Sequence, residues 1–199
     1  MNVREKFNSY ASSYDFFSRF IEPVFGKDKR RILNSLKGKI LEVGVGTGAS
    51  LRYYDFKNIE YYGIDISDNM LYEAKKKFKN IPEKVNLQIG NIEKLNFPSD
   101  HFDIVVSCDV FCTISNPIRG FKEIRRVLRK DGRYIAFEHV KSKNRILGKI
   151  MDLINLIVSS KIATNINRKL VEHMKKAGLK IILDRNIHLD IIKFIIAEK

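Results

Sequence analysis

The sequence predicts an α/β fold, in which a mostly parallel β-sheet is covered by helices on both faces. From residue 38 onward, short apolar runs alternate with segments of helical periodicity, which is the pattern of strand–helix–strand units. The last two apolar runs, at 180–184 and 190–197, are separated only by residues 185–189. Because so short a connection forms a hairpin, one of these two strands must run antiparallel to the rest of the sheet.

Length and composition favour one globular domain. The chain has 199 residues, of which 44% are hydrophobic, enough to bury a core. We expect a helical N-terminal arm at 1–36, a sheet-forming core at 38–140, and a final part at 141–199 that holds two helices and the hairpin.

The chain is strongly basic, with 37 basic and 23 acidic residues and a net charge of +14. Such an excess favours an anionic partner, either nucleic acid, anionic lipid or an acidic substrate. The lysines are spread along the chain, however, so a purely compositional origin fits equally well. Charges occur throughout the first twenty residues and no apolar run reaches 18 residues, which predicts neither a signal peptide nor a membrane span. Cys108 and Cys112 are too few for a disulfide framework or a metal site, and we expect a cytoplasmic protein.

The elements are predicted in chain order. Aromatic and apolar residues at helical spacing predict a helix in the arm, interrupted at Pro23 and Gly26 and followed by a short helix over 28–36. Strands are expected at 39–43, 60–64, 85–89, 102–107, 133–138, 180–184 and 190–197. Helices are expected to begin at Ala49 and to span 69–78, 116–129, 145–158 and 165–177, with Ser67 as an N-cap, a turn at Asp131-Gly132, and Gly178 as a C-cap.

A glycine-rich turn follows the first expected strand. Gly44, Gly46 and Gly48 have the spacing G-x-G-x-G, which departs from the G-x-G-x-x-G of dinucleotide sites. Asp65 ends the second strand, 17 residues after Gly48, where a carboxylate can accept hydrogen bonds from both hydroxyls of a ribose. A tight turn and a helix cap are the structural alternatives, although Ser67 already supplies the cap. Both features predict a nucleoside-containing ligand at the carboxyl ends of the strands, with an NAD-dependent enzyme as a rival interpretation.

The sequence resembles the class I S-adenosylmethionine-dependent methyltransferases. The resemblance rests on LEVGVGTG at 41–48, GIDIS at 63–67, FDIVVS at 102–107 and EIRRVLRKDG at 123–132. It covers about residues 7–140, and more narrowly the sequence resembles the family that includes the menaquinone and ubiquinone C-methyltransferases. It implies a Rossmann-like, seven-stranded, mostly parallel sheet of order 3-2-1-4-5-7-6 with strand 7 antiparallel, and an N-terminal helical lid. The implied cofactor is S-adenosyl-L-methionine, with S-adenosyl-L-homocysteine as its product.

The resemblance also assigns roles to single residues. Asp65 would hold the ribose, Ile66 and Met70 would flank the adenine, and Asn91 would face the adenine amine where the family usually has aspartate; a turn residue is the alternative for Asn91. Asp109 would contact the methionine amino group. The whole predicted cofactor-binding set is Tyr14, Glu42, Gly44, Val45, Gly46, Thr47, Gly48, Asp65, Ile66, Met70, Asn91, Ile92, Ser107 and Asp109.

Two residues are predicted to be catalytic. Tyr14 lies in a segment, with Phe7, Tyr10 and Asp15, that matches the family's N-terminal arm; that arm packs over the cofactor and excludes water, which favours methyl transfer. An ordinary N-terminal helix is the alternative. His139 follows the fifth strand on the substrate side and could act as a general base, although a structural histidine fits as well.

The acceptor is expected to be lipophilic. Residues 145–158 form an apolar helix, usually a sign of core, but Lys141, Lys143, Arg145 and Lys149 flank it, as suits contact with an anionic bilayer. The aromatic residues of 16–25 add apolar surface. The segments EHV at 138–140 and VGVGTGASL at 43–51 are similar to bacterial phosphatidylethanolamine N-methyltransferases and membrane-associated thiol methyltransferases.

We therefore expect a methyltransferase of a lipid or lipophilic small molecule, with phosphatidylethanolamine N-methylation as the leading hypothesis and quinone or thiol methylation as alternatives. Peripheral contact with the inner face of a membrane would follow. An RNA methyltransferase fits the charge, but no N-P-P-Y-like tetrapeptide follows the fourth strand. A non-catalytic partner subunit would not need the intact glycine loop and Asp65.

Overall fold

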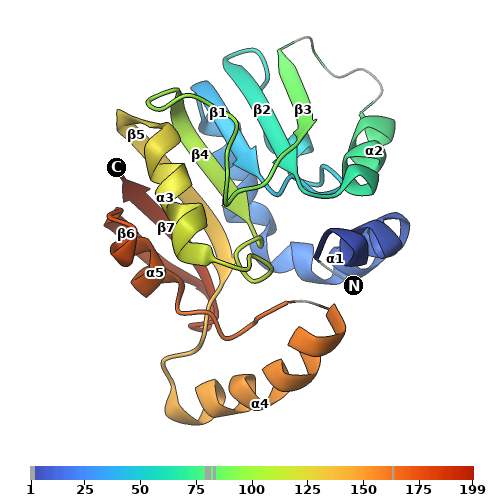
Figure 1. Ribbon diagram of the computed structural model, residues 1–199, viewed down its shortest axis with the longest axis vertical. Coiled ribbons are helices and arrows are strands. Elements are labelled where there is room, and N and C mark those ends of the chain that lie inside the picture. Colours follow the sequence, from blue (N-terminus) through green and yellow to red (C-terminus); the bar gives the residue numbers. More distant parts are fainter. Residues whose placement is uncertain (1–2, 79–81, 83, 163) are drawn as a thin grey trace.

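The computed structural model describes residues 3–78, 82, 84–162 and 164–199, and their side chains except those at 10, 12–26, 157–158 and 160–162. One seven-stranded sheet has the order β3-β2-β1-β4-β5-β7-β6 (Figure 1). β7 pairs antiparallel with β5 and β6, and every other pair is parallel. The strands are β1 Gly38–Val43, β2 Ile59–Asp65, β3 Val85–Ile89, β4 Phe102–Cys108, β5 Leu128–His139, β6 Lys180–His188 and β7 Ile192–Glu198. The predicted fold class, strand order and antiparallel seventh strand are confirmed.

Helices cover both faces of the sheet (Figure 1). On one face lie α3 (Pro117–Val127) and α5 (Leu170–Lys176); on the other lie α1 (Val3–Ser35), η1 (Leu51–Tyr53) and α2 (Asp68–Lys77). Because successive strand residues point to opposite faces, each face has its own core. Phe121 of α3 belongs to one apolar cluster with Leu41 of β1, whereas Leu33 of α1 belongs to the other with Ile40.

The helix starts follow the local sequence. The Ser67 hydroxyl accepts a hydrogen bond from the backbone N–H of Met70 at 3.1 Å, so Ser67 caps α2 as predicted. Asn116 caps α3 in the same way, and Pro117 occupies its first turn, where a missing N–H costs nothing. Gly178 ends α5 with a φ of +86°, as expected of a C-cap glycine.

The predicted break in the N-terminal arm is wrong. α1 is a single helix of 33 residues that continues through Pro23 and Gly26 to Ser35. A proline removes one backbone hydrogen bond and a glycine lowers helix propensity. Leu33 and Leu36 anchor the last part of the arm in the core of the sheet, and such packing outweighs a local preference.

Two further helix predictions are too long, for a common reason. Residues 49–54 form only the 3-10 turn η1, because the Ser50 and Tyr54 hydroxyls bind Glu42 of β1. Residues 165–169 precede α5 as an irregular segment, because the Asn165 N–H donates to the Cys112 carbonyl and the Arg168 carbonyl accepts from the Lys141 N–H. The first segment is held by side-chain bonds to β1, and in the second segment backbone bonds to distant residues replace helical ones.

Two strand predictions are too short. β5 already begins at Leu128, and the predicted turn at 131–132 is a bulge within it: Phe102 of β4 pairs with Leu128, and Ile104 pairs with Arg133. The C-terminal hairpin is longer than expected, so its loop is 189–191 and not 185–189. Leu189 takes a φ of +47° in that loop.

α4 (Arg145–Ile162) lies beyond the carboxyl ends of the parallel strands, away from both helical layers (Figure 1). It begins where predicted and continues four residues further than 158. The Asn144 side-chain oxygen accepts from the N–H groups of Ile146 and Leu147 at 3.0 and 3.1 Å, which fixes the start of the helix. None of the helices in the described part of the chain is both long and apolar enough to span a bilayer.

Candidate cofactor and acceptor site

The glycine loop lies between β1 and η1, at the carboxyl edge of the sheet. A Cβ on Gly44 would lie 2.5 Å from a methyl of Val110, so Gly44 allows close packing against the loop after β4. Gly46 differs: its φ is +55°, and no described heavy atom lies within 4 Å of the position that a Cβ would take. Gly46 therefore leaves open space beside the backbone, as a loop that approaches a ligand requires.

Asp65 lies against this open space. Its carboxylate accepts from the Gly46 N–H at 2.8 Å and from the Ser67 N–H at 2.9 Å. Burial raises the pKa of Asp65 above its ordinary value, and the backbone donors partly offset that shift. The Ile66 N–H is a third backbone donor to Asp65, and since a carboxylate has about four lone-pair sites, an acceptor site remains for a ribose hydroxyl. The structure thus brings Gly46 and Asp65 together as predicted.

The predicted adenine contacts lie around the ends of β2 and β3. Met70 and Ile92 are buried, and Ile66 is half-buried. Asn91 is exposed, and its side-chain oxygen accepts from the Glu93 N–H at 2.8 Å. That bond is an Asx turn, which accounts for Asn91 structurally; its contact with adenine stays a prediction.

Glu42 lies below the glycine loop and is fully buried. Its carboxylate accepts from the hydroxyls of Ser50 at 2.6 Å, Tyr54 at 2.9 Å and Tyr61 at 2.7 Å. Burial raises the pKa of Glu42, while these hydroxyls and the charge of Lys29 act in the opposite direction. Glu42 therefore ties η1 and β2 to β1, and a direct contact with the cofactor stays a prediction.

The remaining predicted residues are buried in the glycine loop, buried in the interior, or have side chains outside the described part of the structure. Val45, Thr47 and Gly48 are buried parts of the loop. The Ser107 side chain is also fully buried and faces an internal hydrogen-bond network. Tyr14 belongs to α1, but its side chain lies outside the described part of the structure, as do those at 16–25; their predicted roles stay predictions.

His139 and Asp109 meet at the neighbouring ends of β5 and β4. The Nδ1 atom of His139 lies 2.5 Å from Oδ1 of Asp109, and both side chains are partly exposed. Burial alone would lower the pKa of His139, but the Asp109 hydrogen bond, the Asp109 charge and the Glu138 charge outweigh it, so the pKa is raised. Such a pair can hold or move a proton at the carboxyl edge of the sheet.

Glu138 is a site residue that the sequence analysis missed. Fully buried, it accepts from the Ser107 hydroxyl at 2.6 Å, from the Val110 N–H at 3.0 Å and from the Phe111 N–H at 3.1 Å. Burial, followed by the charge of Asp109, raises the pKa of Glu138 to about 8. A sequence signal existed, because an acid alternating with Tyr134 and Ala136 on an otherwise apolar strand must face the interior.

Gly46 and Asp65 fit a ligand that carries a ribose, because Gly46 offers close approach and Asp65 offers an acceptor for hydroxyls. The carboxylate of Asp109, further along the edge, meets His139, and its contact with the methionine amino group stays a prediction. Gly44 packs against Val110, so the glycine loop and the turn that carries Asp109 lie side by side.

Comparison with known proteins agrees with this geometry. Residues 41–136 match the family model described as a methyltransferase domain. The chain is 36% identical to a phosphatidylethanolamine N-methyltransferase of Cereibacter sphaeroides over 54% of its own length and 53% of the relative's. It is 27% identical to the ubiquinone/menaquinone biosynthesis C-methyltransferase UbiE of Geobacter sulfurreducens, over 74% and 62%. The matches span 35% to 62% of the length of the first curated relatives.

A solved structure is similar over most of the chain. It is a Haemonchus contortus phosphoethanolamine N-methyltransferase in complex with phosphomonomethylethanolamine and S-adenosylhomocysteine, with a TM-score of 0.69, 19% identity, and coverage of 90% of this chain and 45% of that chain. The match to a methyltransferase domain supports S-adenosylmethionine as the cofactor of this site. The chain therefore contains a segment, residues 41–136, that matches a methyltransferase domain, and its seven-stranded sheet has the fold of the similar solved structure.

Proposed function

We propose that this protein transfers a methyl group from S-adenosylmethionine to a lipid or lipophilic acceptor, with the headgroup amine of phosphatidylethanolamine as the first choice. The observation that carries the proposal is the inverted orientation of α4. A helix on a globular protein normally turns its apolar face inward. α4 turns Asp152 and Asn155 toward the protein together with the buried Met151, and it leaves most of its isoleucines and leucines outward, beyond the edge of the sheet where the site lies.

The inward face of α4 is held by polar bonds. Asp152 binds the Lys141 ammonium at 2.5 Å and accepts from the Asn167 amide at 2.9 Å. Asn155 accepts from the Ile166 N–H at 2.8 Å. The bonds tie the helix to the segments that follow β5 and precede α5, so its orientation is fixed by hydrogen bonds.

The outward face is apolar and exposed. Ile146 is 73% exposed, Ile150 47%, Leu153 68% and Ile154 45%, and their spacing places them on one side of the helix. We call these four residues the apolar face of α4. Exposed Lys143, Arg145 and Lys149 surround its first turns. An apolar surface with a cationic rim suits contact with an anionic lipid surface.

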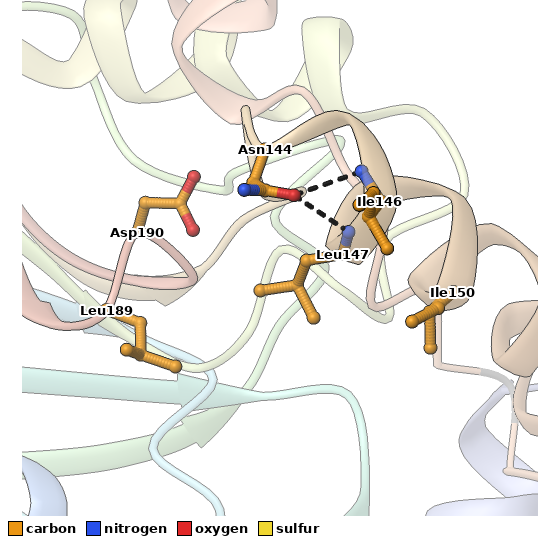
Figure 2. Close-up of a pocket in the computed structure, with 6 residues that line it drawn as sticks. All are labelled: Asn144, Ile146, Leu147, Ile150, Leu189 and Asp190. Atoms are coloured by element: carbon orange, nitrogen blue, oxygen red, sulfur yellow. Dashed lines mark hydrogen bonds between the residues drawn. The ribbon is translucent and has the colours of Figure 1, made fainter.

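A groove opens beside the start of this helix. It has a volume of about 530 Å³ and is lined by Asn144, Ile146, Leu147, Ile150, Leu189 and Asp190. Figure 2 shows Leu147, Ile150 and Leu189 bordering the same space, with Asn144 bonded to the helix start. The Val140 N–H donates to the Ile191 carbonyl at 2.8 Å. Val140 directly follows His139, and Ile191 directly follows the groove residues Leu189 and Asp190, so the groove lies next to the strand end that carries His139. Its lining supports an acyl chain as the occupant, with the headgroup directed to the site.

The chain's own residues would act at two places. Gly46 and Asp65 would hold the cofactor, which when bound supplies a methyl group on a positively charged sulfur. His139 would accept the proton that an ammonium headgroup must lose before its nitrogen can act as a nucleophile. Because the apolar face and the groove would reach the lipid while the protein stays on one side of the bilayer, we propose a peripheral location at an anionic membrane surface.

The deciding experiment measures methyl transfer from radiolabelled S-adenosylmethionine to vesicles of phosphatidylethanolamine and phosphatidylglycerol. We expect label in the lipid fraction, as methylated phosphatidylethanolamine. Leu153→Glu should raise the apparent KM for vesicles at least about tenfold, because a charge on the apolar face opposes insertion, and should leave the affinity for S-adenosylhomocysteine unchanged.

Tyr72→Glu is the matched control. Tyr72 lies on α2 and is 66% exposed, close to the 68% of Leu153, but outside the apolar face; we expect this variant to act like the wild type. Label found only in a quinone or a thiol would replace the proposed acceptor. Equal losses in both variants would overturn the role of α4.

A further inference from the structure

Two carboxylates at neighbouring strand ends are connected to His139, one by direct contact and the other through the backbone of a turn. Asp109 contacts the imidazole directly, at 2.5 Å from Nδ1. Glu138 does not bind the ring; it binds the backbone of the turn that carries Asp109, through the N–H groups of Val110 and Phe111. The chain of contacts therefore runs from Glu138 to the turn, from the turn to Asp109, and from Asp109 to His139.

The turn needs this support because its conformation is unfavourable. Asp109 has a φ of +58°, a left-handed conformation that residues with a side chain adopt at a cost. The Asp109 N–H donates to the Phe137 carbonyl at 2.8 Å, and Glu138 fixes the next two N–H groups. The backbone of Asp109 is thus held in the conformation in which its carboxylate meets the imidazole of His139.

We propose that Asp109 and Glu138 are positioning residues for His139: Asp109 keeps the proton of the neutral ring on Nδ1, and Glu138 holds the turn that places Asp109. In that tautomer the lone pair of the neutral imidazole lies on Nε2. When Nε2 accepts a proton, the ring becomes an imidazolium whose charge Asp109 stabilises. The proton later returns to solvent, so the pair is restored and no other reactant is consumed. The arrangement suits an acceptor that must lose a proton and thereby deepens the proposed function, on which the catalytic part rests.

Several titratable groups of the described residues lie near these two strand ends. Asp109 and Glu138 are the acids that raise its pKa. The Tyr134 hydroxyl reaches Glu138 only through Ser107. Burial raises the pKa values of Cys108 and Cys112, which keeps both thiols neutral. Asp109 is thus the group whose removal should change His139 most.

This role differs from the one that the family resemblance gives Asp109. If Asp109 served the methionine amino group of the cofactor, its removal would weaken cofactor binding and leave the histidine unchanged. If it serves His139, the histidine should change most. The two roles can be separated without any acceptor.

The test is an NMR titration of the full chain labelled with ¹⁵N- and ¹³C-histidine, with His139→Gln to assign the signal. In the wild type, we expect the neutral His139 ring to carry its proton on Nδ1 and to titrate above the ordinary histidine value. Asp109→Asn should lower that pKa by about one unit, a tenfold loss of proton affinity. Calorimetry with S-adenosylhomocysteine should show less than about a threefold change for the same variant.

Glu138 is tested by a matched pair of substitutions. Glu138→Gln keeps an acceptor for the turn and should keep the Nδ1 tautomer. Glu138→Leu removes the acceptor, so the tautomer preference and the raised pKa should be lost. Ser107→Ala, which removes one donor to Glu138 and leaves its charge, provides a milder variant if Glu138→Leu does not fold; it should shift the His139 signal in the same direction.

A proton on Nε2 in the wild type, or a His139 pKa that does not change in Asp109→Asn, would overturn the proposal. So would a tenfold loss of S-adenosylhomocysteine affinity with an unchanged histidine. Because none of these measurements uses an acceptor, they remain decisive even if phosphatidylethanolamine is not methylated. If the NMR titration of His139 gives the expected result but no label enters the lipid fraction, only the proposed acceptor is contradicted.

Discussion

Four acidic side chains organise the site, and each has a different set of partners: Asp65, Glu42, Glu138 and Asp109. Asp65 and Glu42 could be predicted because they belong to local motifs at 41–48 and 63–67. The strand pattern predicts that Glu138 faces the interior, but not its partners, since Val110 and Phe111 come from a loop after another strand. The pairing of Asp109 with His139 was hidden for the same reason: a single sequence shows that two residues follow strands, but not that a left-handed backbone turns one toward the other.

Removing one donor from Glu42 should destabilise the protein. Tyr61→Phe deletes a fully buried hydroxyl that binds the carboxylate at 2.7 Å. We expect the free energy of unfolding to fall by about 1–3 kcal/mol, the cost of leaving a buried acceptor short of a partner. Urea denaturation measures the change. Tyr62→Phe is the matched control, because its hydroxyl binds the exposed Glu60, and it should change stability by less than about 0.5 kcal/mol. Equal effects would mean that the Glu42 cluster adds no stability.

Removing Asp65 should weaken cofactor binding. Asp65→Ala deletes the carboxylate that binds Gly46 and would accept the ribose hydroxyls. We expect calorimetry with S-adenosylhomocysteine to show a loss of about 1–3 kcal/mol, from lost charge-assisted hydrogen bonds. Asp131→Ala, at an exposed position in the bulge of β5, should bind like the wild type. An unchanged affinity in Asp65→Ala would reduce Asp65 to a structural role in the loop.

Among the elements, strands were predicted better than helix ends. Apolar runs such as 102–107 can only be buried, so burial fixes the strand. Helix ends depend on which partners the backbone finds. Residues 165–169 have helical periodicity, yet Asn165 and Arg168 make backbone bonds to Cys112 and Lys141 instead. The apolar helix at 145–158 was predicted, but its periodicity is compatible with a buried or an exposed apolar face. The bonds of Asp152 and Asn155, together with the burial of Met151, determine that this face points outward.

For the whole molecule, the sheet order was predicted by the family resemblance, and the hairpin supported it independently. A short loop between two strands requires antiparallel pairing whatever the family, and β6 and β7 pair in that way. The role of the net charge of +14 could not be predicted in this way, because composition alone does not show whether the charge serves the binding of an anionic partner. The structure supplies a testable reason for it, since basic residues surround the first turns of α4 next to the apolar face.

If the charge serves membrane contact, binding to anionic vesicles should depend on salt. The screening length is about 30 Å at 0.01 M ionic strength and about 10 Å at 0.1 M, and a basic residue near an anionic surface contributes about 1 kcal/mol. We expect the partition coefficient for phosphatidylglycerol vesicles to fall at least about tenfold between 20 and 300 mM NaCl. Weaker binding to neutral phosphatidylcholine vesicles should change little over the same range. Leu153→Glu should reduce the part of binding that survives at 300 mM, because that part comes from the apolar face. Equal binding to both vesicle types at low salt would assign the charge to composition, and the apolar face alone would then have to attract the lipid.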